Sequence, residues 1–252
     1  MSSKEWIVPD WPAPPNVRSL LTTRNGGASS GVYASLNLGS HVGDDPRAVA
    51  ANRALVSGWV AGEPGCAPVW LEQVHGTRVI DAATWTEGDQ APRADAAFSR
   101  QPGVACVVMT ADCLPVLFCD DAGTVVAAAH AGWRGLLAGV LEETIAAMGV
   151  AGRELMAYLG PAIGPQAFEV GEEVRSAFVR RDGNAATAFK PSESGKWLAD
   201  IYLLARQRLA GQGIDRAFGG SLCTASEADR FFSYRRDGQS GRMASMIWLD
   251  SA

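Results

Sequence analysis

Residues 109–135 read MTADCLPVLFCDDAGTVVAAAHAGWRG and place two of the most reactive side chains, Cys113 and His130, within one short stretch. Two Val-rich apolar runs beside them predict buried strands, Val104–Thr110 (VACVVMT) and residues 124–129 (TVVAAA), because each is short, continuous and bounded by Gly or Asp. Cys113 comes just after the first run, and His130 directly follows the second. Since open α/β folds place their chemistry at strand ends, we expect both side chains to belong to a functional site.

A helix is predicted after His130, where Gly-Trp-Arg-Gly is followed by LLAGVLEETIAAMG with Glu142 and Glu143 on the polar side. The N-terminus of this helix would direct free N–H groups and a positive dipole end toward the His130 site. Such an end favours a negatively charged ligand.

The remaining chain alternates strand-like and helix-like segments without a linker or an internal repeat. Strands are predicted at 18–23, 69–74, 154–159 and Met243–Leu249, and helices at 45–58, 170–181 and 197–210. This order indicates an α/β fold with helices outside a mixed sheet, formed by residues 1–252 as a single domain.

The bulk composition excludes several classes of function. The chain has 252 residues and a net charge of -5, with no basic cluster longer than Arg-Arg, so nucleic-acid binding is not expected. No apolar run approaches the roughly 18–20 residues of a membrane span, and the N-terminus lacks the apolar core of a signal peptide. Five irregularly spaced cysteines do not indicate a disulfide framework, so a reducing cytoplasm is the expected compartment. The residues carry no signal for an oligomeric state.

Histidine is scarce, because the chain contains only His41, His75 and His130. His75 follows the predicted strand at 69–74 and lies beside a glycine. Two imidazoles and the thiolate of Cys113 suit zinc or copper with a fourth position open, which is the pattern of a catalytic metal site. The alternative is that these residues have only structural roles, with Cys113 as a small buried apolar side chain and each histidine as a hydrogen-bonded residue.

The same residues permit a chemistry without metal. His130 can lower the pKa of the Cys113 thiol and act as its base, so that Cys113 attacks an amide or ester carbonyl. The spacing does not separate the two hypotheses, although the additional His75 favours a metal. Asp112 can orient a ligating histidine or cap its own turn, and for Asp95 the simpler explanation is a loop cap.

A long Gly-, Ser- and Asn-rich loop follows the first predicted strand, and its apolar residues indicate that it is ordered. Arg24, Asn37 and His41 can reach a ligand from this loop. The competing explanation is that Asn37 makes hydrogen bonds within the loop and that His41 is merely exposed.

Several long motifs resemble the YfiH family of bacterial proteins, also known as DUF152 or as multicopper polyphenol oxidase (laccase) proteins. The motifs are TTRNGG (22–27), SLNLGSHVGDDP (35–46), QVHG (73–76), MTADCLPVLF (109–118), AAAHAGWRG (127–135), LGPAIGP (159–165), FEVG (168–171) and the segment from RFFSYRRDG to GRMAS (230–245). They span nearly the whole chain, and no ligand position departs from the family pattern.

The resemblance implies a single-domain α/β/β/α sandwich, similar to the cysteine-hydrolase-like catalytic domain of cytotoxic necrotizing factor toxins. It also implies a zinc ion held by His75, Cys113 and His130, with Cys113, His130 and Asp112 as catalytic candidates. Family members are described as purine nucleoside phosphorylases that act on adenosine, guanosine, inosine and methylthioadenosine, and as adenosine deaminases. An older interpretation makes them copper-dependent phenol oxidases, and some members are linked to peptidoglycan precursors.

Phosphorolysis requires an anion site beside the ribose, and deamination requires an activated water near the purine. Arg24 and Arg134, together with Asn37 and His41, are therefore the candidates for binding substrate and phosphate. The multicopper oxidase hypothesis has less physical support, because three histidines are too few to bind several copper ions. The partners expected from the resemblance are thus purine nucleosides and phosphate, with zinc as the cofactor and copper as the alternative. The other alternative is a metal-free cysteine amidase acting on peptidoglycan precursors.

Overall fold

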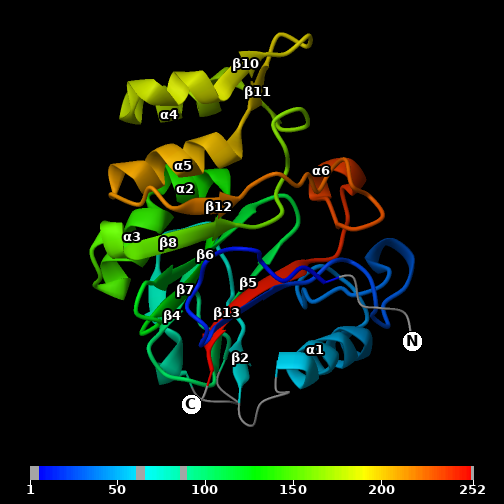
Figure 1. Ribbon diagram of the computed structural model, residues 1–252. Helices are drawn as coiled ribbons and strands as arrows, with labels where there is room; N and C mark the ends of the chain where they lie inside the picture. Colours follow the sequence, from blue (N-terminus) through cyan, green and yellow to red (C-terminus); the bar gives the residue numbers. More distant parts are fainter. Residues whose placement is uncertain (1–5, 61–65, 86–89, 251–252) are drawn as a thin grey trace.

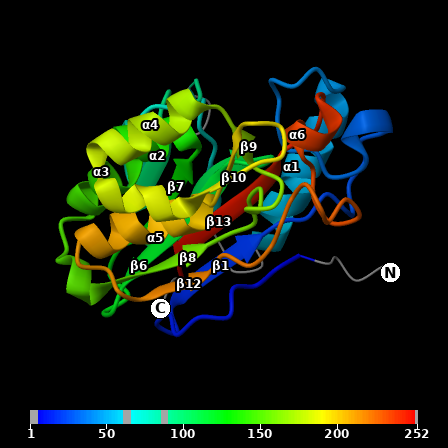
Figure 2. The same ribbon diagram turned by 90° about the horizontal axis from the view of Figure 1, so that it is seen from above.

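The computed structural model of the protein describes residues 6–60, 66–85 and 90–250. Its described residues form two large β-sheets that lie face to face, with helices on both outer sides (Figure 1). The view from above separates α1 from the group formed by α3, α4 and α5 (Figure 2). The predicted α/β/β/α sandwich is therefore confirmed.

The four-stranded sheet has the order β1-β13-β5-β2, and the six-stranded sheet has the order β12-β8-β6-β7-β4-β3. The strands of the first are β1 (Val17–Leu21), β2 (Ala67–Val69), β5 (Val104–Thr110) and β13 (Met243–Leu249). Those of the second are β3 (Val79–Asp81), β4 (Ala96–Ser99), β6 (Leu114–Asp120), β7 (Val126–Ala131), β8 (Leu155–Leu159) and β12 (Ala217–Gly219). A small third sheet consists of β9 (Glu169–Val170), β10 (Phe189–Pro191) and β11 (Trp197–Ala199), with the strand order β10-β11-β9.

The helices are α1 (Pro46–Val60), α2 (Trp133–Ala138), α3 (Val140–Met148), α4 (Glu172–Arg181), α5 (Ile201–Gly211) and α6 (Tyr234–Asp237), with 3-10 turns at Gly31–Tyr33, Ala82–Thr84, Gly152–Glu154 and Gly183–Ala188. Within the described ranges, no helix is long and apolar enough to cross a membrane.

Each central strand is buried on both faces, because alternate residues enter different cores. On β5, Cys106 and Val108 pack between the two sheets, while Val107 packs against α1. On β7, Val126 and Ala128 enter the core between the sheets, and alanines at the intervening positions pack toward α3 and α5. This alternation explains why both strands read as continuous apolar runs.

Several predicted boundaries were wrong in an informative way. The second predicted strand is β7, which extends to Ala131 and therefore contains His130. The strand predicted at 69–74 is only Ala67–Val69, so His75 lies in a loop. The predicted helix at 197–210 begins at Ile201, because the side chain of Asp200 caps it by accepting the N–H of Leu203.

One strand and one helix break were not predicted from the sequence. Residues 114–120, where no strand was predicted, form β6 in the interior of the six-stranded sheet. The single helix predicted after His130 is divided into α2 and α3 by Gly139, whose φ of +113° belongs to the left-handed region.

Candidate metal and nucleoside site

His130 is fixed by the pairing of β4 with β7. The pairing of Ala96 with Ala129 places Asp95, the residue before β4, beside His130. The backbone N–H of His130 donates to the carbonyl of Asp95 at 2.7 Å, and its Nδ1 lies 2.8 Å from Asp95 Oδ1. His130 is 3% exposed and Asp95 is fully buried. The imidazole therefore has one orientation, with Nε2 left for a ligand.

Asp95 also organises the loop that carries His75. Its carboxylate accepts the backbone N–H groups of Val74, His75 and Gly76 at 3.2, 2.9 and 2.7 Å. These bonds hold His75 in a left-handed conformation with φ of +60°. Burial alone would raise the pKa of Asp95, but the hydrogen bonds from His130 and from the backbone lower it below its usual value.

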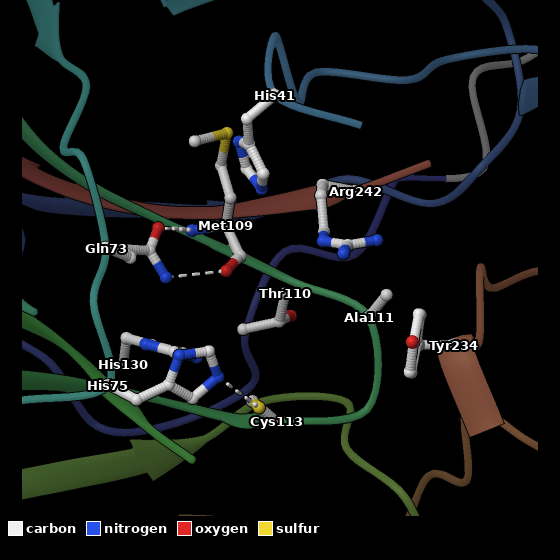
Figure 3. Close-up of a pocket in the computed structure, with 10 residues that line it drawn as sticks. All are labelled: His41, Gln73, His75, Met109, Thr110, Ala111, Cys113, His130, Tyr234 and Arg242. Atoms are coloured by element: carbon white, nitrogen blue, oxygen red, sulfur yellow. Dashed lines mark hydrogen bonds between the residues drawn. The ribbon is translucent and has the colours of Figure 1, made fainter. Parts of the chain in front are cut away.

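Cys113 completes the group from the position directly before β6. Its Sγ lies 3.8 Å from His75 Nε2, and the rings of His75 and His130 meet edge to face with centroids 4.7 Å apart. The three side chains converge in Figure 3. Gly132 permits this approach, because a Cβ there would lie 2.9 Å from the sulfur of Cys113 and 3.0 Å from His75 Cδ2.

The electrostatics favour a thiolate beside an imidazolium. Burial alone would raise the pKa of Cys113, but the charge of His130 and hydrogen bonds from both histidines lower it to about 6. Burial alone would lower the pKa of His130, whereas the thiolate of Cys113 and the bond to Asp95 raise it to about 9. The group therefore holds one negative sulfur ready to bind a cation.

A metal ion fits these donors. One nitrogen from each histidine and the sulfur of Cys113 all lie within 4.8 Å of one another. Tetrahedral zinc, with bonds of about 2.0 Å to nitrogen and 2.3 Å to sulfur, spaces its donors roughly 3.5 Å apart, so the side chains need to contract only slightly. The hydrogen bond from His130 to buried Asp95 is the outer support that metal-binding histidines usually have. Copper accepts the same donors, so the geometry does not choose between the two metals.

The donor group borders a pocket of about 370 Å³. This volume lies within the range of roughly 300–1,000 Å³ that is typical of small-molecule sites. The lining residues are His41, Gln73, His75, Met109, Thr110, Ala111, Cys113, His130, Tyr234 and Arg242 (Figure 3). Gln73 is held by both backbone groups of Met109, at 2.8 Å each. The pocket therefore has a three-donor end and an open end formed by His41, Tyr234 and Arg242.

A family model described as a multi-copper polyphenol oxidoreductase laccase matches residues 18–250. The purine nucleoside phosphorylase YfiH of Escherichia coli is 56% identical to the chain, over 96% of this chain and 98% of that protein. A purine nucleoside phosphorylase of Pseudomonas aeruginosa is also 56% identical, over 97% and 98%. The chain belongs to the YfiH family.

Solved structures of the family have the same fold. The crystal structure of a Neisseria meningitidis protein of the DUF152 family aligns with a TM-score of 0.94 and 57% identity, over 98% of this chain and all of that one. YlmD from Geobacillus stearothermophilus aligns with a TM-score of 0.88 at 29% identity, over 100% of this chain and 98% of that one. The YfiH sandwich thus persists where sequence identity is low.

The structure brings together His75, Cys113, His130 and His41, but not the other predicted residues of this YfiH protein. Asn37 is fully buried. Its side-chain amide forms hydrogen bonds with Gly39 in the same loop and accepts the backbone N–H of Arg242. Arg24 donates to the carbonyls of Ala34 and Ala228 and lies over the Phe232 ring. Neither side chain lines the pocket.

Arg134 and Asp112 also differ from the prediction. Arg134 is exposed and stacks on Trp133, outside the pocket lining. Asp112 accepts the hydroxyl of Thr224 and the backbone N–H of Arg235, both at 2.6 Å, and so holds α6 beside the pocket. The carboxylate that orients His130 is Asp95 instead.

Sequence reasoning missed Gln73, Tyr234 and Arg242 as pocket residues. Gln73 and Arg242 lie inside the motifs QVHG and GRMAS, and Tyr234 lies inside RFFSYRRDG, so the motifs themselves were the available signal. Asp95 stood in no motif, and its role follows only from strand register.

Proposed function

We propose that this protein is a zinc-dependent purine nucleoside phosphorylase that also deaminates adenosine, with adenosine, guanosine, inosine and methylthioadenosine as substrates. The observation that carries the proposal is the His75–Cys113–His130 donor group at one end of a small-molecule pocket. The names of relatives that are 56% identical over nearly their whole length support purine nucleosides as the substrate class.

We also propose that residues 1–252 act as one catalytic unit. The pocket takes Thr110 from the four-stranded sheet and His130 from the six-stranded sheet, so neither sheet forms it alone. The core between the sheets continues beneath it.

In phosphorolysis a phosphate oxygen forms a bond to ribose C1′ while the bond from C1′ to the purine nitrogen breaks. The purine leaves with the bonding electron pair and gains a proton, giving the free base and ribose 1-phosphate. His75, Cys113 and His130 would hold a zinc ion, which supplies positive charge and lowers the pKa of a bound water to about 7. Asp95 keeps His130 in one tautomer.

Deamination exchanges the amino group at purine C6 for the oxygen of a water molecule, and ammonia leaves. The same donor group lies at the pocket end where this atom would have to be placed. The protein's contribution is to position the ring, because a misplacement of about 1 Å can cost roughly a hundredfold in rate.

Two alternatives use the same residues. The family description names copper, which binds nitrogen and sulfur donors more tightly than zinc. With three histidines in the sequence, a single copper ion fits better than a multicopper centre. The order Cys113, His130 and Asp95 also suits a metal-free cysteine amidase acting on peptidoglycan precursors, with His130 as the base.

The test is to incubate purified protein with adenosine, with and without phosphate, and to separate the products by chromatography. Protein as purified, after chelation, and after addition of zinc or copper should be compared. We expect adenine and ribose 1-phosphate only with phosphate, inosine without it, and loss of both on chelation with recovery by zinc.

Cys113→Ala should lose both the activities and the bound zinc. Cys119→Ala is the matched control, because Cys119 is a buried cysteine in the core between the sheets and away from the donor group. Full conversion by Cys113→Ala would rule out this site. Phenol oxidation that needs copper, or amide cleavage that survives chelation, would favour the corresponding alternative.

A further inference from the structure

The open end of the pocket contains an arginine that is anchored on one side only. The first amino group (Nη1) of Arg242 donates to Ser240 O at 2.9 Å, to Ser240 Oγ at 3.3 Å and to Gly241 O at 3.0 Å. All three acceptors are neutral. The stem of Arg242 packs against Gly39, where a Cβ would lie 2.8 Å from its Cγ. The guanidinium is therefore held in place without being neutralised.

The other edge of the same guanidinium is unused. Within the part of the chain that the structure describes, Nε–H and Nη2 of Arg242 have no hydrogen-bond partner, and no carboxylate forms an ion pair with it. The guanidinium extends toward the hollow bordered by Thr110, Ala111 and Tyr234 (Figure 3). A planar fork of two N–H donors is the arrangement that binds two oxygens of a phosphate or carboxylate.

Arg242 supplies the positive charge at the open end of the pocket. Among the described residues that line the pocket, Arg242 is the one arginine or lysine, and His41 lies beside it. Burial lowers the pKa of His41, and the nearby charges of Arg242 and Arg53 lower it further. Arg53 itself stacks on Trp70 behind the pocket wall. The lowered pKa leaves His41 as a neutral hydrogen-bonding group beside the charged Arg242. Cys113 and Asp112 act on Arg242 through their negative charge, but among the described residues neither forms an ion pair or a hydrogen bond with its guanidinium.

We propose that Arg242 and His41 form the subsite that binds a phosphoryl group in this pocket, opposite the His75–Cys113–His130 group. The inference deepens the proposed function, on which it rests, by replacing Arg24 and Arg134 as the phosphate ligands. A nucleoside between the two ends would have its reacting bond flanked by an oxyanion on one side and by the donor group on the other.

A second hollow gives this subsite access from another side. It has a volume of about 230 Å³, shares His41, Tyr234 and Arg242 with the first pocket, and is otherwise lined by Val42, Gly238, Gln239 and Ser240. The phosphoryl group can therefore be free phosphate or a group carried on the nucleoside, since both present the same oxyanion to Arg242.

Asn37 is a positioning residue for this subsite. Its Oδ1 accepts the backbone N–H of Arg242 and that of Gly39, each at 2.9 Å, and its Nδ2 donates to Asp44. The buried amide thus connects the loop that carries His41 to the strand end that carries Arg242.

The test measures binding of inorganic phosphate and of AMP by titration calorimetry to the full chain, without turnover. Arg242→Gln should weaken phosphate binding at least about tenfold, because a charged bidentate contact is lost. Arg242→Lys, which keeps the charge and loses the fork, should recover only part of it. Arg180→Gln removes one exposed arginine of α4 and is the matched control, expected to bind as the parent does.

A loss confined to phosphate identifies the free ion as the source, and a loss confined to AMP identifies the nucleotide; either supports the subsite. Unchanged binding of both by folded Arg242→Gln, checked by its melting temperature, would overturn it. Kinetics separate this from the proposed function: a raised phosphate KM with kcat largely kept supports the subsite. If the parent protein cleaves no nucleoside, the proposed function fails while the binding result still stands.

Discussion

The buried end of the pocket contains His130, which is held by the pairing of β4 with β7 and by a hydrogen bond to Asp95 behind it. The open end consists of His41, Tyr234 and Arg242. His41 lies in a loop, Tyr234 in the short helix α6, and Arg242 directly before β13. Asp95 is fully buried, whereas Tyr234 is 60% exposed. The rigid sandwich thus fixes the reactive atoms, whereas side chains distant in sequence shape the entrance. Substitutions at the two ends should therefore have different consequences.

The largest expected effect concerns the thiolate at the buried end after metal removal. With a pKa of about 6, Cys113 should react with iodoacetamide with a midpoint near pH 6, and the reactive form is lost as pH falls below that value. At pH 7 a thiol of this pKa is roughly 90% thiolate, against about 1% for one of pKa 9.

Mass spectrometry of alkylated peptides measures this midpoint in chelated protein. Cys119, whose pKa burial raises to about 12, should remain unmodified in the folded state. The thiolate is paired with His130, whose pKa of about 9 keeps the imidazolium up to that pH. A Cys113 midpoint near pH 9 would show that the two side chains do not interact as described.

The second prediction compares Asp95→Asn with Asp112→Asn. Both oxygens of Asp95 accept N–H donors, so an amide would place an NH₂ group against donors and remove the charge facing His130. Zinc affinity should fall about 10–100-fold. Asp112 contacts Thr224 and the backbone of Arg235 instead, so Asp112→Asn should leave zinc affinity unchanged.

Competition with a chromophoric chelator gives both affinities. Asparagine tolerates the φ of +91° found at Asp112, which makes this control conservative in backbone terms. A larger loss of zinc affinity in Asp112→Asn than in Asp95→Asn would show that Asp112 is the carboxylate that orients the histidine.

The third prediction concerns Gly132→Ala at the buried end. The added Cβ must displace the sulfur of Cys113 or the ring of His75, so kcat/KM for adenosine should fall at least about tenfold. Gly58→Ala is the control, because no atom lies within 4 Å of a Cβ there and the residue is helical. That variant should gain about 0.5–1 kcal/mol of unfolding free energy. Equal kinetics for the two variants would mean that the donor group tolerates looser packing.

The smallest effect is expected at the open end with Tyr234→Ala. Stacking of a base on an aromatic ring contributes roughly 1–3 kcal/mol, so the nucleoside KM should rise about fivefold or more. The melting temperature should not change, because Tyr234 is mostly exposed. Val32→Ala removes another exposed apolar side chain that does not line the pocket and should be silent. A fall in stability without a change in KM would make Tyr234 structural.

Local patterns predicted most of the secondary structure, and failed where tertiary contacts override them. Val104–Thr110 and Met243–Leu249 were predicted correctly, because their apolar runs are long and continuous. β6 was missed although it is equally apolar. It contains Pro115, and a proline usually argues against an interior strand, but Pro115 lies at the strand's second position and its carbonyl still accepts the N–H of Gly160.

The sequence by itself determined the donor set, since His75, Cys113 and His130 are scarce, reactive residues within recognisable motifs. Only the tertiary structure decided which charged groups lie beside these donors and across the pocket from them. Asp95 lies 35 residues from its partner His130, and a strand pairing one residue out of register would turn His130 to the other face of the sheet. Arg242 and His41 line the same pocket although most of the chain separates them in sequence. Residue type and spacing specify chemistry locally, whereas the partner of a charge depends on which backbones the fold brings within about 3 Å.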